Sequence, residues 1–293
     1  MIISIASGKG GTGKTTLAVN LAMFLSEYRN VILADLDVEE PNSGLFIGGK
    51  KVREEIFHTM IPEWQGDLCT RCDKCREVCN FHAITRIRNE VLVFPQLCHS
   101  CYACSELCPA DALPMKAKRC GIIRHFSRDS LDFIEGVMDI GQEQAVPLIA
   151  GTMRYIDEHF PGDILCIADA PPGTSCPMIK AVKDADYVIL VTEPTPLGLY
   201  DLSLAVDTVR ELKKNFGVVL NRDGIGNGDV EVYCRKEHIP LIARIPQQRR
   251  IAERYAEGKL LYQNFPEVRN ALEDIIRTLG IASATANTEK GRQ

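Results

Sequence analysis

The strongest constraint on the fold is a glycine-rich stretch close to the start of the chain. Residues 7–16 read Ser-Gly-Lys-Gly-Gly-Thr-Gly-Lys-Thr-Thr. The apolar run before them, residues 2–6, suits a buried strand, and the apolar run after them, residues 17–25, suits a buried helix. A glycine loop between a strand and a helix is the setting of a phosphate-binding loop, so the sequence predicts an α/β fold built around a nucleotide.

The spacing within this stretch fits the pattern G-x-x-x-x-G-K-[ST], with Gly8, Gly13, Lys14 and Thr15 at the defined positions. The glycines allow backbone N–H groups to turn toward phosphate oxygens, and the helix beginning near Thr15 directs its positive dipole end at the same anion. Lys14 is expected to reach the β- and γ-phosphates, and the Thr15 hydroxyl to ligate Mg²⁺. The residues of this loop expected to contact the nucleotide are Gly8, Gly10, Gly11, Thr12, Gly13, Lys14, Thr15 and Thr16.

Two other interpretations of the loop are weaker. Gly8, Gly10 and Gly13 also satisfy the dinucleotide pattern G-x-G-x-x-G, and Asp35 could then bind a ribose. A dinucleotide loop does not need the Lys-Thr pair that follows Gly13, whereas a triphosphate loop does. A turn without a ligand would not require so many glycines, because each one increases the backbone entropy lost on folding.

Composition limits the remaining possibilities. The chain has 293 residues, of which 45% are hydrophobic, and a formal charge of −5 spread along its length. This length suits one large α/β domain and one small domain, and the charge does not predict a nucleic-acid groove. The chain passes from Met1 directly into the first strand, with no leader or long apolar segment, so we expect a cytoplasmic protein without membrane insertion. Twelve cysteines in that compartment favour metal binding over disulfides.

Two acids follow the second predicted strand, which covers residues 31–34. Asp35 and Asp37 stand at its carboxyl end, where strands of a parallel sheet present residues to ligands, so both should lie near the phosphates. A purely local role, capping the turn at residues 41–44, remains an alternative for Asp35. Residues 45–62 carry no clear pattern.

Eight cysteines then form two sets with the spacing C-x2-C-x2-C-x3-C, and the second set repeats the first after 29 residues. This is the pattern of a small α+β bacterial-type ferredoxin with two [4Fe–4S] clusters, in which the fourth cysteine of each set binds the other cluster. The expected ligands are Cys69, Cys72, Cys75 and Cys108 for the first cluster, and Cys98, Cys101, Cys104 and Cys79 for the second.

Zinc is the alternative occupant of these cysteines, because C-x2-C pairs also build zinc ribbons. A tetrahedral zinc needs only two such pairs, so the third closely spaced cysteine of each set favours iron–sulfur clusters. Asn80 departs from the pattern, since a proline commonly follows the fourth cysteine. His82 and His99 lie within the motifs and are expected to be surface or packing residues.

The later part of the chain reads as further strands of the same sheet. Residues 164–168 form an apolar run that ends at Asp169, where an acid would bind Mg²⁺ through water, and the N–H of Gly173 would sense the γ-phosphate. Further apolar runs cover residues 187–192, 216–220 and 241–245. Near-continuous apolar strands separated by helices predict a doubly wound, mostly parallel sheet. The expected division of the chain is 1–62 and 119–281 for the nucleotide-binding domain, 63–118 for the inserted ferredoxin, and 282–293 for a disordered tail.

The segment Lys-Gly-Gly-Thr-Gly-Lys-Thr at residues 9–15 resembles the deviant Walker A loop of the MinD/ParA/Mrp/nitrogenase iron-protein class of ATPases. With the cysteine-rich insert, the chain resembles MinD-superfamily ATPases that contain an inserted ferredoxin domain. The resemblance places the signature lysine of the class on Lys9, which would reach the phosphates bound to the partner subunit. It therefore implies an ATP-dependent homodimer.

The resemblance also assigns roles near the nucleotide. It implies that Asp37 orients the attacking water and that Asp35 supports the Mg²⁺ shell. It places Asn221, followed by Arg222, at the adenine, and Pro246 near the cover of the base. The residues expected to act in catalysis are Lys9, Lys14, Asp37 and Asp169.

Two features outside these motifs remain. Cys176 stands seven residues after Asp169, and the nitrogenase iron protein is similar in having a cluster-binding cysteine at that offset, so a redox role is weighed against an ordinary thiol. Residues 266–279 are amphipathic, with charges of both signs on the polar face, and are expected to form a packing helix rather than a membrane anchor.

Three functions fit these observations. The first is an ATP-hydrolysing iron–sulfur protein in which nucleotide state gates electron delivery to an unidentified redox partner. The second, suggested by Mrp-like relatives, is a carrier that delivers clusters to an acceptor protein. The third is a nucleotide-regulated binding module whose clusters are structural. Stable ferredoxin-type cysteine sets favour the first, because a carrier needs a cluster that leaves easily.

Overall fold

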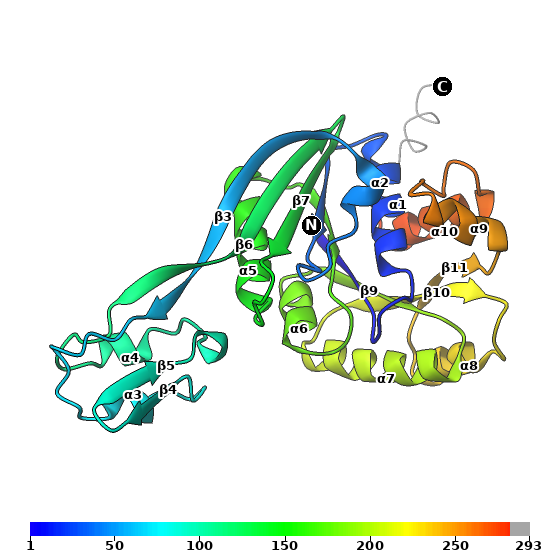
Figure 1. The fold of residues 1–293 in the computed structure, drawn as a ribbon. Helices are drawn as coiled ribbons and strands as arrows, with labels where there is room; N and C mark the ends of the chain where they lie inside the picture. The colour runs from blue at the N-terminus through cyan, green and yellow to red at the C-terminus, as the bar shows by residue number, and fades with distance from the viewer. Residues whose placement is uncertain (282–293) are drawn as a thin grey trace.

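The structure is a computed structural model, and it describes residues 1–281. A nine-stranded sheet forms its centre, and seven neighbouring strands are joined by parallel pairing (Figure 1). Across the sheet the parallel strands are β11 (Leu241–Pro246), β10 (Phe216–Asp223), β9 (Tyr187–Thr192), β1 (Ile2–Ala6), β8 (Leu165–Asp169), β2 (Val31–Asp35) and β7 (Leu131–Met138). Two antiparallel strands complete one side, β6 (Met115–Arg128) and then β3 (Lys50–Pro62) at the edge.

Helices cover both faces of this sheet (Figure 1). One apolar core joins the sheet to α1 (Lys14–Ser26), the short α2 (Gly44–Ile47), α9 (Arg249–Ala256) and α10 (Pro266–Thr278). The other core joins it to α5 (Val146–His159), α6 (Cys176–Lys183), α7 (Pro196–Glu211) and α8 (Asp229–Lys236). Because both faces are covered, β2 and β8 are buried at every residue, which accounts for their continuous apolar sequences. The predicted α/β fold with a large, mostly parallel sheet is confirmed.

Strands β3, β6 and β7 were not evident from the sequence. Strands β3 and β6 pair over 12 positions and form a long antiparallel ribbon that extends from the sheet (Figure 1). The ribbon is held against α5, because a Cβ atom added at Gly151 would lie 2.3 Å from the ring of Phe57. Strand β6 begins at Met115, so residues 115–118, which we expected to belong to the insert, lie in the ribbon.

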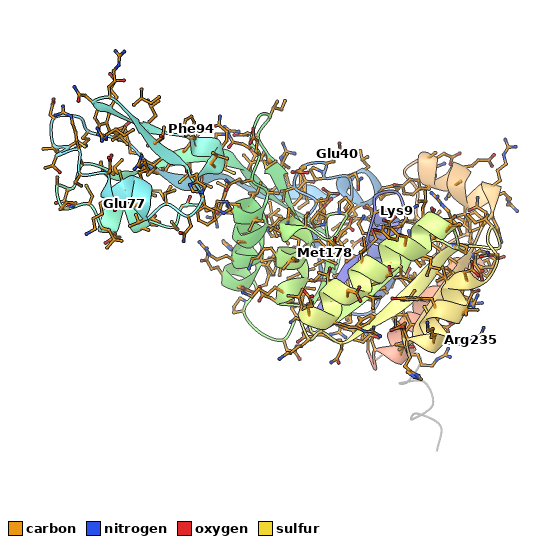
Figure 2. All side chains as sticks on the ribbon, turned by 90° about the horizontal axis from the view of Figure 1, so that it is seen from below. Lys9, Glu40, Glu77, Phe94, Met178 and Arg235 are labelled. Carbon is orange, nitrogen blue, oxygen red and sulfur yellow. The ribbon has the colours of Figure 1, made fainter. Side chains whose placement is uncertain are left out.

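Residues 63–114 form a small unit at the far end of the ribbon, which we call the module (Figure 1). It contains the hairpin β4 (Ile84–Ile87) and β5 (Glu90–Val93), the 3₁₀ turn η1 (Pro95–Leu97), and the single-turn helices α3 (Lys74–Glu77) and α4 (Ala103–Glu106). Figure 2 shows Glu77 and Phe94 at this end of the molecule, well away from Lys9. The module is therefore joined to the nucleotide-binding part by the two strands of the ribbon, and it also contacts the segment between β7 and α5.

The last described helix, α10, packs against the body of the protein. Val268, Leu272 and Ile275 of α10 are buried in the core shared with α1, which confirms the predicted packing helix. Among residues 1–281, no helix has both the length and the apolar character needed to cross a membrane. The predicted disordered tail, residues 282–293, lies outside the described residues.

Candidate functional site

The phosphate loop lies between β1 and α1, where the sequence places it. Gly13 is the N-cap of α1 and has a φ of 98°, a left-handed conformation that favours glycine. A Cβ atom at this position would also lie 2.3 Å from Nδ2 of Asn221. Lys14 is buried directly behind it, and burial lowers the pKa of its ammonium group. The loop thus presents a helix N-terminus and a desolvated cation to an anionic ligand.

Two buried carboxylates stand beside the loop, at the carboxyl ends of neighbouring strands. Asp35 of β2 and Asp169 of β8 are register partners, and both are almost fully buried. Burial raises the pKa of each, and the charge of Asp35 raises the pKa of Asp169 further. Two acids in this position oppose each other electrostatically, so a bound cation would stabilise both in the ionised form.

The hydrogen bonds of these acids distinguish their roles. Asp35 accepts backbone N–H groups from Asp37, Asn42 and Ser43 at 3.0–3.1 Å, so it fixes the loop after β2. Asp169 accepts the Ser43 hydroxyl on Oδ2 at 3.3 Å, while its Oδ1 is buried without a partner among the described residues. Asp169 therefore has the free oxygen that suits Mg²⁺, whereas the local capping role considered for Asp35 is present in this structure.

The signature lysine makes an ion pair within its own chain. Lys9 Nζ lies 2.6 Å from Oε1 of Glu193, and Nη1 of Arg222 lies 2.7 Å from Oε2 of the same carboxylate. Arg222 also donates to the Gly11 carbonyl at 3.1 Å, and Asn221 donates to the Thr12 carbonyl at 2.8 Å. Asn221 and Arg222, expected at the base, thus contact the phosphate loop here, and the Oδ1 of Asn221 makes no hydrogen bond to the described residues.

The other predicted nucleotide residues surround this centre. Gly173 has a φ of 93°, and its N–H donates to the Ser7 carbonyl at 3.0 Å instead of pointing freely toward a phosphate. Pro246 is the last residue of β11 and the register partner of Asp223, at the same edge of the sheet as Asn221. Asp37 is partly buried, and burial raises its pKa. The remaining predicted contacts, Gly8, Gly10, Thr15 and Thr16, lie in the loop and the first turn of α1.

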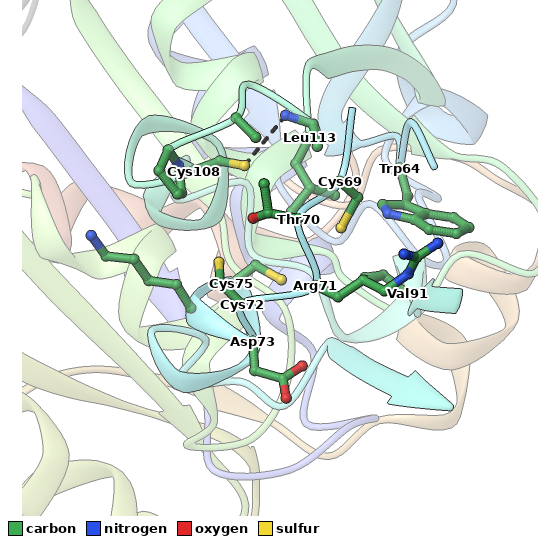
Figure 3. A pocket seen from close by; sticks show the side chains of 14 residues that line it. Trp64, Cys69, Thr70, Arg71, Cys72, Asp73, Cys75, Val91, Cys108 and Leu113 are labelled. Carbon is green, nitrogen blue, oxygen red and sulfur yellow. Dashed lines mark hydrogen bonds between the residues drawn. The ribbon is translucent and has the colours of Figure 1, made fainter. Parts of the chain in front are cut away.

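The eight motif cysteines lie in two groups within the module. Cys69, Cys72 and Cys75 line one cavity together with Cys108 from the other repeat (Figure 3). A second cavity is lined by Cys98, Cys101, Cys104 and, again from the other repeat, Cys79. We call these cysteine centre 1 and cysteine centre 2. This grouping is the one that the spacing predicts.

The backbone of the module repeats with the cysteines. Left-handed conformations at non-glycine residues occur in pairs separated by 29 positions, namely Arg71 and Ser100, Asp73 and Tyr102, and His82 and Asp111. Such conformations are strained and persist only where the surrounding structure holds them. Turns of this kind direct successive N–H groups into a concave surface that suits an anion. The two centres therefore share the same strained backbone turns.

Hydrogen bonds to sulfur repeat in the same way. The N–H of Ala83 lies 3.3 Å from Sγ of Cys79, and the N–H of Ala112 lies 3.3 Å from Sγ of Cys108 (Figure 3). Burial raises the pKa of the Cys104 thiol to about 11, with a contribution from neighbouring thiols. Burial also raises the pKa of the Cys75 and Cys98 thiols, whereas hydrogen bonds lower the pKa of the exposed Cys72. A cationic group bound among the cysteines would favour their thiolate forms. Each centre therefore offers four thiols around one cavity, while in residues 1–281 no three side chains of the metal-binding types lie close enough to hold a single metal ion.

Comparison with known proteins identifies the family. Residues 3–261 match the model of the CobQ/CobB/MinD/ParA nucleotide binding domain. The chain belongs to this family. An uncharacterised ATP-binding protein of Methanocaldococcus jannaschii is 39% identical over 259 residues, which cover 86% of this chain and 76% of the relative. The protein is therefore an ATP-binding protein of the MinD/ParA type, a family of P-loop ATPases.

More distant comparisons agree with this family. An iron-sulfur cluster carrier protein of Pyrococcus horikoshii is 22% identical, over 92% of this chain and 83% of that protein. The solved structure of MinD with Mg-ADP from Pyrococcus horikoshii has a TM-score of 0.58 at 21% identity, and covers 95% of both chains. A complex of Cyanothece McdA with ATP has a TM-score of 0.60 at 18% identity, over 96% of this chain and 97% of that one. At these identities the solved structures support the fold of the family.

Sequence reasoning missed Glu193. This residue directly follows β9, at the same sheet edge as Asp35 and Asp169, and its position after an apolar strand was the available signal. Its partner Lys9 is 184 residues away, so the pairing itself was not predictable from sequence. Of the cysteines outside the motifs, Cys120, Cys166 and Cys234 are buried, whereas Cys176 is exposed at the start of α6.

Proposed function

We propose that this family member hydrolyses ATP and couples its nucleotide state to electron transfer through two [4Fe–4S] clusters. The observation that carries the proposal is the pair of four-cysteine centres, each assembled across the repeat and lined by the same strained backbone turns. The nucleotide half of the proposal is supported by the phosphate loop with its buried Lys14 and by the Oδ1 of Asp169, which has no hydrogen-bond partner within residues 1–281. The module, at the end of the ribbon, then acts as the electron-carrying part (Figure 1).

At the nucleotide site, the chain's own residues supply binding and orientation. Lys14 and the loop N–H groups hold the phosphates, while Thr15 and Asp169 hold Mg²⁺. Asp37 orients the attacking water, and Asn221 offers its Oδ1 to the adenine amino group while its amide supports Thr12. Lys9 leaves Glu193 to contact the phosphates of a second subunit, and Arg222 then keeps the Glu193 carboxylate neutralised. The active species is thus a homodimer.

At the cysteine centres, the chain supplies ligands and a polar surrounding. Cys69, Cys72, Cys75 and Cys108 hold the first cluster, and Cys98, Cys101, Cys104 and Cys79 hold the second. When bound, the clusters supply one-electron chemistry, with a low-potential protein or flavin as the donor. N–H donors to Cys79 and Cys108 stabilise thiolate charge. Exposed apolar side chains of the module, among them Leu68, Phe81 and Leu107, offer a surface to a redox partner.

A cluster carrier is the second candidate, and Cys176 is the observation that favours it. This exposed thiol opens α6 directly after the loop that follows Asp169, so it is close to the nucleotide-sensitive region. A protein similar to this chain is named an iron-sulfur cluster carrier. A labile cluster held by Cys176 and its counterpart in a dimer would serve delivery, while the module reduces or stabilises it.

The deciding experiment is chemical and spectroscopic analysis of the anaerobically prepared protein. Iron, sulfide and zinc are measured per chain, followed by EPR after dithionite reduction with and without Mg·ATP. The proposal predicts about eight irons, an interaction signal from two reduced clusters, and a spectrum that changes with ATP. Lys14→Ala should keep the clusters and lose the ATP response. Zinc without sulfide refutes the cluster assignment, and an ATP-insensitive spectrum favours the carrier.

A further inference from the structure

The segment between β7 and α5, residues 139–145, contacts both the nucleotide-binding part and the module, and we call it the strap. Its first neighbour is the loop that carries Asp37. The N–H of Met138, the last residue of β7, donates to the carbonyl of Val38 at 2.9 Å. The contact is tight, because a Cβ atom added at Gly136 would lie 2.7 Å from Cγ1 of Val38. A movement of the Asp37 loop must therefore shift the end of β7 or break this bond.

The strap begins with a well-anchored residue. The N–H of Asp139 donates to the Cys120 carbonyl at 3.0 Å, and its carboxylate accepts two bonds from Arg119 at 2.8 and 3.1 Å. Such a bidentate pair fixes orientation as well as distance. Both partners belong to β6, the ribbon strand that returns from the module. The Asp139–Arg119 pair, which we call the corner, thus holds the start of the strap rigidly. A displacement at the end of β7 therefore moves the corner and the strap together.

The strap ends on the module. Nε2 of Gln144 donates to the Gln96 carbonyl at 2.7 Å. Gln96 lies in η1, two residues before Cys98, and the Cys98 N–H is bonded to the Pro95 carbonyl at 3.3 Å. Gln96, Cys98, Cys120 and the strap residues Gln142–Gln144 line one small polar pocket. The Gln144 side chain is therefore hydrogen-bonded to the turn that precedes Cys98, one of the four cysteines of cysteine centre 2.

This contact distinguishes the two centres. The position equivalent to Gln96 in the first repeat, 29 residues earlier, is Asp67. Within the described residues, Asp67 has no hydrogen bond to the nucleotide-binding part. The left-handed residues around both centres repeat closely, so the strap contact is one feature that distinguishes them; the Asp73–Arg86 ion pair beside centre 1 is another.

We propose that the strap transmits the nucleotide state to cysteine centre 2 alone, through the Gln144–Gln96 hydrogen bond. Closure of the Asp37 loop on ATP shifts the end of β7, the Asp139–Arg119 corner carries the shift, and Gln144 moves or releases the turn before Cys98. The inference rests on the proposed function, since it assigns the regulation to one of its two centres. Electrons controlled by ATP then pass through centre 2, while centre 1 remains insensitive to nucleotide.

Hydrogen–deuterium exchange tests the link without relying on activity. Exchange is measured for peptides covering residues 94–98 and 65–69, with and without Mg²⁺ and the non-hydrolysable analogue AMPPNP. We expect the nucleotide to change exchange in 94–98 by about fivefold, the effect of one hydrogen bond, and to leave 65–69 unchanged. Gln144→Ala should abolish the difference, and Gln144→Glu, which places an acceptor against the Gln96 carbonyl, should do the same.

The matched control is Ile140→Ala, because the Ile140 side chain lies in the strap, is fully exposed and does not line this pocket. It should keep the wild-type response, and Lys14→Ala should lose it. An equal response at 94–98 and 65–69, a full response in Gln144→Ala, or no response in wild type that binds AMPPNP would each overturn the strap proposal. EPR of the reduced protein should show the ATP effect on one cluster and lose it in Gln144→Ala. Failure of the proposed function is separate, since it appears as missing iron and sulfide or as an EPR spectrum that ATP does not change, whereas hydrogen exchange tests the strap.

Discussion

The ammonium of Lys9 lies 2.6 Å from the carboxylate of Glu193 in the same chain. The lysine that we propose to reach a partner subunit is therefore already bound, in the single chain, to a buried acid that Arg222 also contacts. Burial acts to raise the pKa of Glu193, but the Lys9 ammonium and the Arg222 guanidinium draw it below its usual range, so this carboxylate is ionised at neutral pH. Under the proposed function, dimerisation on ATP breaks this pair, so the strength of the pair should set the ATP concentration at which subunits associate.

Glu193→Gln should lower the ATP concentration needed for dimerisation by about three- to tenfold, since a partly exposed ion pair contributes about 1 kcal/mol. Analytical ultracentrifugation at graded ATP concentrations measures the midpoint. Glu231→Gln is a suitable control, because Glu231 makes a similar bond to Arg244, at 2.9 Å, and neither residue contacts Lys9. An unchanged or higher midpoint in Glu193→Gln would show that this pair does not restrain Lys9.

Substitutions of Lys14 and Lys9 should impair different steps, namely ATP hydrolysis and dimerisation. Lys14→Ala removes the buried cation behind the loop, and we expect the rate of ATP hydrolysis to fall about 10²- to 10³-fold, as for loss of one charged group in a preorganised site. Lys9→Ala should leave nucleotide binding to the single chain nearly intact and abolish dimerisation. Fluorescent-nucleotide titration and phosphate release separate the two. Equal loss of binding in both variants would contradict the assigned roles.

Sequence reasoning succeeded where burial is uniform. The central strands are apolar throughout because both faces are covered, so β1, β2, β8 and β9 were predictable. Strand β3 was not, because it is an edge strand whose side chains are largely exposed, and it carries charged residues that discourage pairing with other chains. Its partner is more than fifty residues away, beyond the module, so the ribbon has no local signal.

In the candidate site, too, the local patterns could be predicted from the sequence and the long-range contacts could not. The phosphate loop and the cysteine sets are local patterns, and the structure brings their residues together as the spacing predicts. Glu193, the Ser43–Asp169 bond and the Gln144–Gln96 contact join segments separated by tens of residues or more. Only the fold brings such pairs together, which is why the sequence did not predict them.

The buried acids make the nucleotide-free chain sensitive to pH. Burial raises the folded-state pKa of Asp169 and Asp35 above the value near 4 of an unfolded chain. The folded chain then binds protons more tightly than the unfolded chain. For each acid, the free energy of unfolding should therefore decrease as the pH rises from the unfolded-state pKa to the folded-state pKa. Thermal unfolding from pH 5 to pH 8 without nucleotide tests the direction.

Asp169→Asn isolates this effect. It removes a buried charge, so at pH 8 the melting temperature of the nucleotide-free chain should rise, by about 2–4 °C for each kcal/mol gained. The gain should shrink at pH 5, where the wild-type acid holds its proton. Mg²⁺ should stabilise the wild type and not the variant. A lower melting temperature for Asp169→Asn at pH 8 would mean that this carboxylate is compensated in the free chain.

The crosswise assembly of the cysteine centres gives the last prediction. Cys69 and Cys108 lie in one cavity although they belong to different repeats, whereas Cys104, only four residues before Cys108, lies in the other. Cys69→Ser and Cys108→Ser should each lower the iron content from about eight to about four per chain, and the double variant should lose no more. Each should also remove the EPR interaction between reduced clusters.

Cys104→Ser combined with Cys108→Ser should instead remove both clusters, because the two residues serve different centres. The exposed Cys176→Ser is the control and should retain about eight irons. Iron and sulfide analysis of the anaerobic proteins distinguishes these patterns. If the pair Cys104 and Cys108 behaved as one centre, each repeat would hold its own cluster, and the shared cavities would have to serve another purpose.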